Sequence, residues 1–105
     1  MSYNLFIDDL REVSYISNIL SPFVESDWKV CRTSSEAISC VIEHGIPEFI
    51  SFDHDLGEED TVMIFLKKWT VLFPLNKFPD YHIHSSNPVG KENIESFVRS
   101  FNNSF

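Results

Sequence analysis

Three short apolar runs in this chain end in side chains that could do chemistry. These three polar clusters are Asp8-Asp9, Asp53-His54-Asp55 and His84-Ser85-Ser86-Asn87. Several carboxylates can share a confined site only if a cation, bound protons or a cationic ligand offsets their repulsion. Carboxylates gathered with imidazoles therefore indicate either a divalent-metal site or acid/base chemistry on a shared proton.

Asp8, Asp9 and Asp53 are the expected metal ligands, because hard divalent ions prefer carboxylate oxygens. Magnesium is the first choice for this metal. Manganese and zinc are the alternatives, since nearby imidazoles suit softer metals. His82 and His84 lie two residues apart on an expected strand and would point to one face, but further zinc ligands are missing from their surroundings in the sequence.

The acidic residues also have a purely structural interpretation. Aspartate is common at turns and as the cap of a following helix, so a single acidic pair would need no further explanation. In open parallel sheets, however, ligands bind outside the carboxyl ends of the strands. Three polar clusters at three such ends favour one shared functional site.

The elements that must position these clusters are short strands alternating with amphipathic helices. Strands are expected over residues 3–9, 27–32, 48–53 and 81–84. Helical periodicity links four sets of apolar residues: Ile16, Ile19, Leu20 and Phe23; Ala37, Ile38, Val41 and Ile42; Val62, Phe65, Leu66, Trp69 and Phe73; Ile94, Phe97, Val98 and Phe101. Thr33 and Glu36 have the spacing of a capping box for the second helix. This alternation predicts right-handed βαβ units around a parallel sheet, an α/β fold in which residues 1–105 form a single domain.

Charge and composition exclude several classes of function. The net charge of -8 argues against a broad DNA-binding surface, which needs clustered Lys and Arg, while a small or terminal phosphate remains compatible with it. Cys31 and Cys40 form neither a C-x-x-C pair nor a zinc spacing, so we expect reduced thiols. No signal-like segment or membrane-spanning apolar run is present, which predicts a cytoplasmic protein that does not contact a membrane.

The sequence resembles a family known as the cyclic-phosphate processing receiver domain, an offshoot of the response-regulator receiver fold. The resemblance covers nearly the whole chain and is carried by residues 5–11, by Asp-His-Asp-Leu-Gly at 53–57 and by His-Ser-x-Asn-Pro-x-Gly at 84–90. It implies a flavodoxin/receiver-like three-layer sandwich, with a truncated four-stranded parallel sheet of order 2-1-3-4 and helices on both faces. It also implies processing of cyclic phosphates on nucleotides or RNA ends.

The comparison with ordinary receivers implies roles for individual residues. Asp8 and Asp9 match the acidic metal-binding pair after the first strand, Asp53 matches the phosphoacceptor position, and Ser85 matches the hydroxyl after the fourth strand. The chain ends before the fifth strand and lysine that ordinary receivers carry. This departure favours an enzyme over a phosphorelay receiver.

The leading hypothesis is a metal-assisted phosphoesterase, a cyclic-phosphate hydrolase whose partner is a small phosphorylated substrate or an RNA end. Its general acid/base is His84. The expected catalytic residues are Asp53, His84, Asp55 and His54, and the expected substrate-binding residues are Arg11, Arg32, Ser85 and Asn87. One alternative is a non-catalytic receiver that accepts a phosphoryl group on Asp53. Another is an acidic binding or inhibitor domain that meets a basic protein partner.

Overall fold

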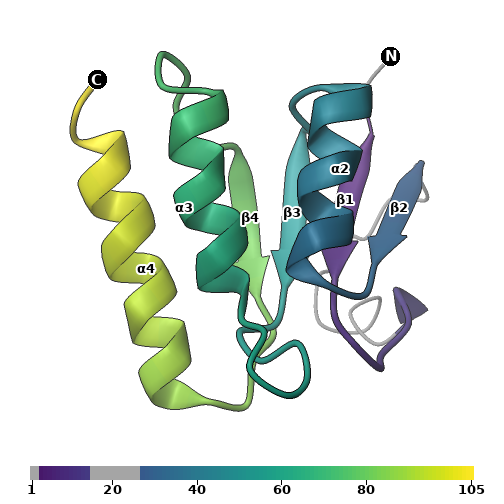
Figure 1. Ribbon diagram of the computed structural model, residues 1–105. Coiled ribbons are helices and arrows are strands. Elements are labelled where there is room, and N and C mark those ends of the chain that lie inside the picture. Colours follow the sequence, from purple (N-terminus) through teal and green to yellow (C-terminus); the bar gives the residue numbers. More distant parts are fainter. Residues whose placement is uncertain (1–2, 15–26) are drawn as a thin grey trace.

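A parallel sheet forms the centre of the fold in the computed structural model, which describes residues 3–14 and 27–105 (Figure 1). Its strands are β1 (Asn4–Ile7), β2 (Trp28–Cys31), β3 (Phe49–Phe52) and β4 (Asp80–Ile83). They lie in the order β2-β1-β3-β4, and every neighbouring pair is parallel. The predicted α/β, receiver-like fold with strand order 2-1-3-4 is therefore confirmed, and each strand lies within two residues of its expected bounds.

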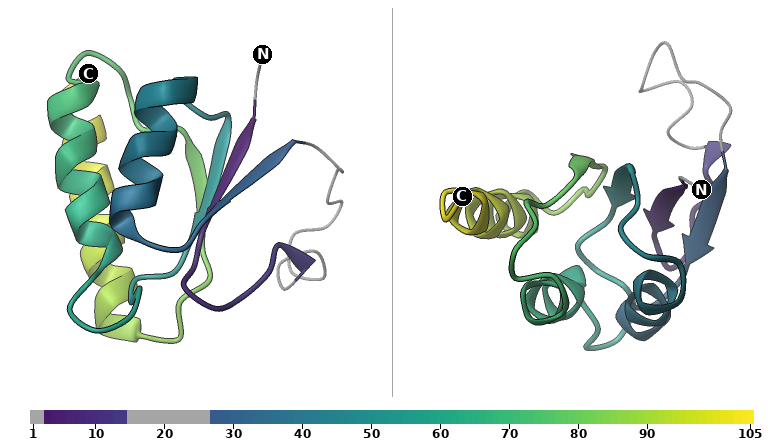
Figure 2. Two further views of the ribbon diagram at one scale, coloured as in Figure 1. Left: turned by 45° about the vertical axis from the view of Figure 1, so that its right-hand side comes forward. Right: turned by 90° about the horizontal axis from the view of Figure 1, so that it is seen from above.

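The described helices follow the last three strands. They are α2 (Ser34–His44), α3 (Val62–Leu72) and α4 (Pro88–Asn102). Helices α2 and α3 cover one face of the sheet, while α4 lies beside α3 near the β4 edge (Figure 2). The first expected helix, with Ile16 and Phe23, lies outside the described residues. None of the helices in the described part of the chain has the length and apolar composition of a membrane-spanning segment.

The core lies between the sheet and these helices. Alternate strand residues point into it, which follows from the two-residue period of a strand. The fully buried core side chains include Leu5, Ile7, Ile50, Phe52, Val41, Phe65, Leu66, Trp69 and Ile94. Each such side chain contributes about 1.5–3 kcal/mol by leaving water. The core therefore holds the helices over the sheet, whose parallel backbone pairing brings the strand ends to a common edge.

One expected core residue is exposed. Ile42 was placed on the buried face of α2 by periodicity, but 61% of its surface is accessible. The buried stripe of α2 runs through Ala37 and Val41, four residues apart. Ile42 lies a further 100° around the helix, beyond the width of this stripe.

Side-chain caps begin two of the helices and shape the loops that leave the strands. The Thr33 hydroxyl accepts a hydrogen bond from the amide of Glu36 at 3.0 Å, as expected for a capping box. The Glu36 carboxylate accepts from the amide of Arg32 at 2.8 Å, one residue earlier than that motif requires. Asn87 caps α4 by accepting from the amide of Gly90 at 3.0 Å. These caps terminate each loop at a defined residue.

Candidate active site

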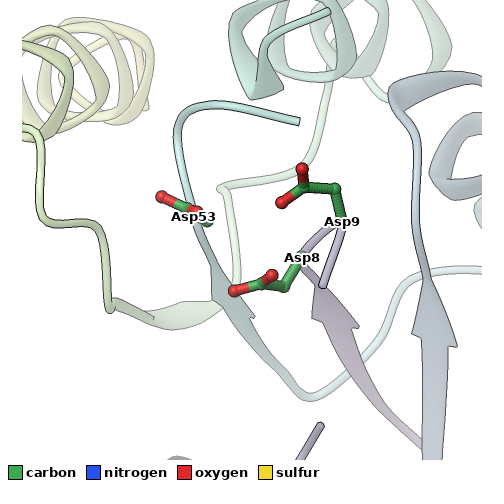
Figure 3. A group of neighbouring side chains, drawn as sticks. All are labelled: Asp8, Asp9 and Asp53. Atoms are coloured by element: carbon green, nitrogen blue, oxygen red, sulfur yellow. The ribbon is translucent and has the colours of Figure 1, made fainter. Parts of the chain in front are cut away.

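Three carboxylates meet where neighbouring strands β1 and β3 end. Asp8 and Asp9 follow β1, and Asp53 follows β3 (Figure 3). One carboxylate oxygen from each residue lies within 4.8 Å of the other two. Two oxygens bound to the same Mg²⁺ at about 2.1 Å can be at most about 4.2 Å apart, and Ca²⁺ allows about 5 Å. This all-oxygen donor set is of the kind that hard divalent cations prefer, and its spacing exceeds the Mg²⁺ limit by at most about 0.6 Å.

Asp8 is the fixed member of this group, with 1% of its surface exposed. Its Oδ1 accepts hydrogen bonds from the amides of Leu10 and Arg11, both at 2.9 Å, and its Oδ2 lies 2.9 Å from Nε2 of His84. Burial alone would raise the pKa of Asp8, but these amides and His84 outweigh it and leave the pKa below its ordinary value. Asp8 is consequently an ionised, oriented carboxylate at neutral pH.

His84 is buried beneath this site, and its side chain has 0% exposure. Its Nδ1 lies 2.8 Å from the Ser51 hydroxyl, and its ring stacks on Phe6 with centroids 4.9 Å apart and planes at 5°. Burial lowers the pKa of His84, although Asp8 and Asp53 act in the opposite direction. The sequence-based expectation placed His84 against the substrate as the general acid/base. In the structure the ring has no exposed surface for such a contact.

A second imidazole, His54, lies in the loop after β3 with 12% of its side chain exposed. Its Nδ1 is 3.0 Å from Oδ1 of Asp55, whose Oδ2 accepts from the Asn87 side-chain amide at 3.1 Å. These contacts with His54 and Asn87 lower the pKa of Asp55. The amide of His54 donates to Oδ1 of Asp53 at 2.8 Å. His54, Asp55 and Asn87 thus connect the carboxylate group to the start of α4.

Gly90 fits closely against His54. A methyl group at Gly90 would lie 2.5 Å from Cγ and 2.8 Å from Nδ1 of His54. Ordinary carbon–carbon contacts are about 3.5–4.0 Å, so only glycine leaves room for the ring in this position. The start of α4 therefore contributes to the site through Gly90 in its first turn and Asn87 at its N-cap.

The two arginines expected to bind substrate brace the exit of β1. Nη1 of Arg32 donates to the backbone carbonyls of Asp8, at 3.1 Å, and of Arg11, while its Nη2 forms an ion pair with Glu12 at 2.7 Å. Arg11 donates from Nη1 to the carbonyl of His84 at 3.1 Å, and the same nitrogen lies 4.0 Å from Oδ2 of Asp8. Arg11 is therefore beside the carboxylates, and Arg32 holds the backbone behind them.

Ser85 lies one residue beyond the position that stands level with Asp53. Phe52 pairs with Ile83 in the sheet, so the next residues, Asp53 and His84, stand level with each other. The Ser85 hydroxyl accepts from the amide of Asn87 at 3.1 Å and shapes the loop before α4.

The loop from His54 to Thr61 is closed by its own hydrogen bonds. The amide of Val62 donates to the carbonyl of His54 at 2.8 Å, and the amide of Leu56 donates to the carbonyl of Asp60 at 2.9 Å. The Asp60 carboxylate also accepts from the amide and hydroxyl of Ser34, at 2.9 and 2.5 Å. These bonds fasten the loop to the start of α2.

An open pocket of about 450 Å³ lies against this loop, and its lining comprises Thr33 and residues 56–60. A methyl group at Gly57 would be 3.5 Å from Oδ2 of Asp9, so the pocket wall adjoins the carboxylate group. Glu58, Glu59 and Asp60 make this wall acidic. The carboxylate group and the pocket form one continuous region of negative charge.

Sequence reasoning brought together Asp8, Asp9 and Asp53 but missed the residues that support them. The sequence pattern places Ser51 only within a strand, although a hydroxyl within the apolar run 49–52 is a detectable signal. Phe6 carries no comparable signal, and Gly90 enters only as the last residue of the motif at 84–90, because their roles depend on contacts between distant segments. The pair of His82 and His84 gains no further metal ligand: within residues 3–14 and 27–105, the group close enough to share a metal contains neither of them.

Comparison with known proteins is informative at the level of the family. Searches of curated proteins and of solved structures each found no significant match. A family model described as the cyclic-phosphate processing receiver domain matches residues 3–100, and the chain therefore belongs to that family.

Proposed function

We propose that this chain is a metal-assisted phosphoesterase that opens a cyclic phosphate, or removes a terminal one, on a nucleotide or an RNA end. The family supports the substrate class. The observation that carries the proposal is the group of Asp8, Asp9 and Asp53, whose oxygens lie within 4.8 Å of one another at the ends of the strands. Ligands of open α/β sheets bind at this edge.

The charge of the site requires a cation if the ligand is a phosphate. A phosphate anion next to three carboxylates would be repelled, and the chain as a whole carries a net charge of -8. Asp8, Asp9 and Asp53 would hold the divalent ion, with magnesium the first candidate and manganese or zinc the alternatives. When bound, such an ion neutralises phosphate oxygens and lowers the pKa of coordinated water.

His54 is the imidazole that we assign to proton transfer. Asp55 is ionised and can only accept, so the hydrogen at their 3.0 Å contact belongs to Nδ1 of His54. In the neutral form of the ring, Nε2 carries the lone pair and can take a proton from the attacking water. When the phosphorus–oxygen bond breaks, the same nitrogen can return that proton to the leaving oxygen. Asn87 keeps Asp55 in place during both steps.

Arg11 and the pocket supply the remaining parts of a binding site. The Arg11 side chain is 33% exposed and lies 4.0 Å from Oδ2 of Asp8, where a guanidinium can contact a phosphate oxygen. The 450 Å³ pocket is within the range of small-molecule sites, about 300–1,000 Å³. Because its wall is acidic, it suits the neutral or donor-rich part of a nucleotide better than a second phosphate.

The decisive experiment measures phosphate-ester hydrolysis by the purified chain. We expect turnover of 2′,3′-cyclic nucleotides, cyclic dinucleotides or ADP-ribose phosphates with Mg²⁺, Mn²⁺ or Zn²⁺, and none with a chelator. Asp53→Asn should abolish it. Asp80→Asn is the matched control, because Asp80 is an exposed aspartate at the start of β4, the opposite end of the sheet. No turnover, together with phosphorylation of Asp53 by a small phosphodonor, would favour the phosphoacceptor alternative.

A further inference from the structure

The buried pair of Ser51 and His84 has no contact with the pocket, yet it touches the carboxylate group directly. We infer that His84, held by Ser51, is a positioning residue that aims Oδ2 of Asp8 at the cation, and that its hydrogen bond sets the affinity of the site for metal. This inference rests on the proposed function, because it concerns the same metal site.

The acceptor positions of Asp8 show why His84 matters. An ionised carboxylate offers about four lone-pair positions, two on each oxygen. The amides of Leu10 and Arg11 use both positions on Oδ1, and Nε2 of His84 uses one on Oδ2. The position left for a cation is therefore on Oδ2. The direction of that lone pair depends on the side from which His84 donates.

The ring of His84 is held in the one orientation that provides this donor. Because the Asp8 carboxylate can only accept, the hydrogen at the 2.9 Å contact sits on Nε2. Nδ1 is then an acceptor, and the Ser51 hydroxyl at 2.8 Å donates to it. The parallel stacking on Phe6, with planes at 5°, fixes the tilt of the ring. A half-turn of the ring would remove both hydrogen bonds at once.

In many metal sites a carboxylate orients a metal-binding imidazole through a hydrogen bond. Here the roles are reversed, and the imidazole orients the carboxylate. Hydrogen-bond partners of metal ligands orient them, and losing such a partner typically lowers metal affinity about 10- to 100-fold. The 0% exposure of the His84 side chain protects the bond from competing water. A role as the group that contacts substrate would need the opposite, an accessible ring nitrogen.

Two substitutions at His84 separate positioning from acid/base catalysis. The amide nitrogen of glutamine can occupy the place of Nε2, whereas asparagine is too short to reach Asp8 from there. We expect His84→Gln to bind Mn²⁺ within about threefold of the wild-type affinity, and His84→Asn to bind it about 10- to 100-fold more weakly. Calorimetry or Mn²⁺ electron paramagnetic resonance measures this binding without substrate.

Ser51→Ala tests the support of the ring while keeping the imidazole, and we expect an intermediate loss of Mn²⁺ affinity. Ile50→Val is the matched control. Ile50 is the neighbouring β3 residue, is fully buried and belongs to the core on the helix side. Its truncation should lower the melting temperature and leave Mn²⁺ affinity unchanged, which distinguishes positioning from general packing.

The outcomes also separate this inference from the proposed function. Wild-type Mn²⁺ binding with equal affinities in His84→Gln, His84→Asn and Ser51→Ala would overturn the positioning role and leave the metal site intact. If wild type binds no divalent ion, both fall. If His84→Gln and His84→Asn bind Mn²⁺ like wild type but lose all turnover, His84 is a catalytic acid/base and the inference is wrong.

Discussion

Replacing Gly90 with alanine should destabilise the protein, against the usual expectation for a helix. Gly90 lies in the first turn of α4, three residues after the cap Asn87. Alanine within a helix is normally more stable than glycine by about 0.5–1 kcal/mol. Here the added methyl group would meet Cγ of His54 at 2.5 Å. The ring or the helix must move by about 1 Å to restore an ordinary contact.

The magnitude follows from two opposing effects. Overpacking of this kind typically costs about 1–3 kcal/mol. Subtracting the gain in helix propensity leaves a net loss of about 0–2.5 kcal/mol in the free energy of unfolding, with a central value of about 1 kcal/mol. For a domain of this size the central value lowers the melting temperature by roughly 4–8 °C. A 1 Å displacement of His54 can also reduce turnover about 10²-fold.

The assay is thermal unfolding followed by circular dichroism, with cyclic-nucleotide turnover measured in parallel. Ser96→Ala is the matched control, because Ser96 is an exposed residue of the same helix and should become slightly more stable. A Gly90→Ala variant as stable as wild type, with unchanged turnover, would refute the close fit of His54 against α4.

The remaining predictions concern charge and hydrogen bonding. Asp53→Asn should raise the melting temperature of the metal-free protein, because it relieves repulsion among the three carboxylates. It should also abolish the rise in melting temperature that Mg²⁺ produces in wild type. Calorimetry measures both effects, and an undiminished Mg²⁺ effect would argue against Asp53 as a ligand. Burial lowers the pKa values of His82 and His84 below 6.5, with Lys91 adding to the effect at His82. The unfolded chain therefore binds more protons below pH 6.5, so metal-free stability should be full above that pH and fall as the pH drops; equal urea midpoints at pH 7.5 and 5.5 would contradict this. Ser34→Ala should cost about 1–3 kcal/mol in urea unfolding, because Asp60 loses the hydroxyl donor at 2.5 Å, and a neutral result would mean that water replaces it.

The fold could be predicted from the sequence because its signals are local. Apolar strands such as Phe49–Phe52 alternate with segments of helical periodicity. Because connections between parallel strands are almost always right-handed, few topologies remain. The meeting of Asp8, Asp9 and Asp53 followed from that topology alone. The backbone pairing of the strands brings their ends together, independently of the side chains at those ends.

The burial of His84 was not predictable by the same reasoning. A polar residue just after a strand is ordinarily read as facing the crevice, and the sequence does not show on which side of the sheet it points. Its position depends on register, which puts it level with Asp53, and on the ring of Phe6 from another strand. Arg11 and Arg32 illustrate the same difficulty, since a guanidinium that could bind phosphate can equally hold backbone carbonyls.

The self-closed loop between His54 and Thr61 has a consequence for how this site can diversify. The hydrogen bond from the amide of Val62 to the carbonyl of His54 holds the two ends of the loop together. The entropy lost on closing the loop is therefore already included in the stability of the folded domain. Residues added at the tip, beside Glu58, would reshape the pocket at little cost in stability. Asp53 would keep its place at the end of β3. Such a loop would let the shape of the pocket change while Asp8, Asp9 and Asp53 stay where they are.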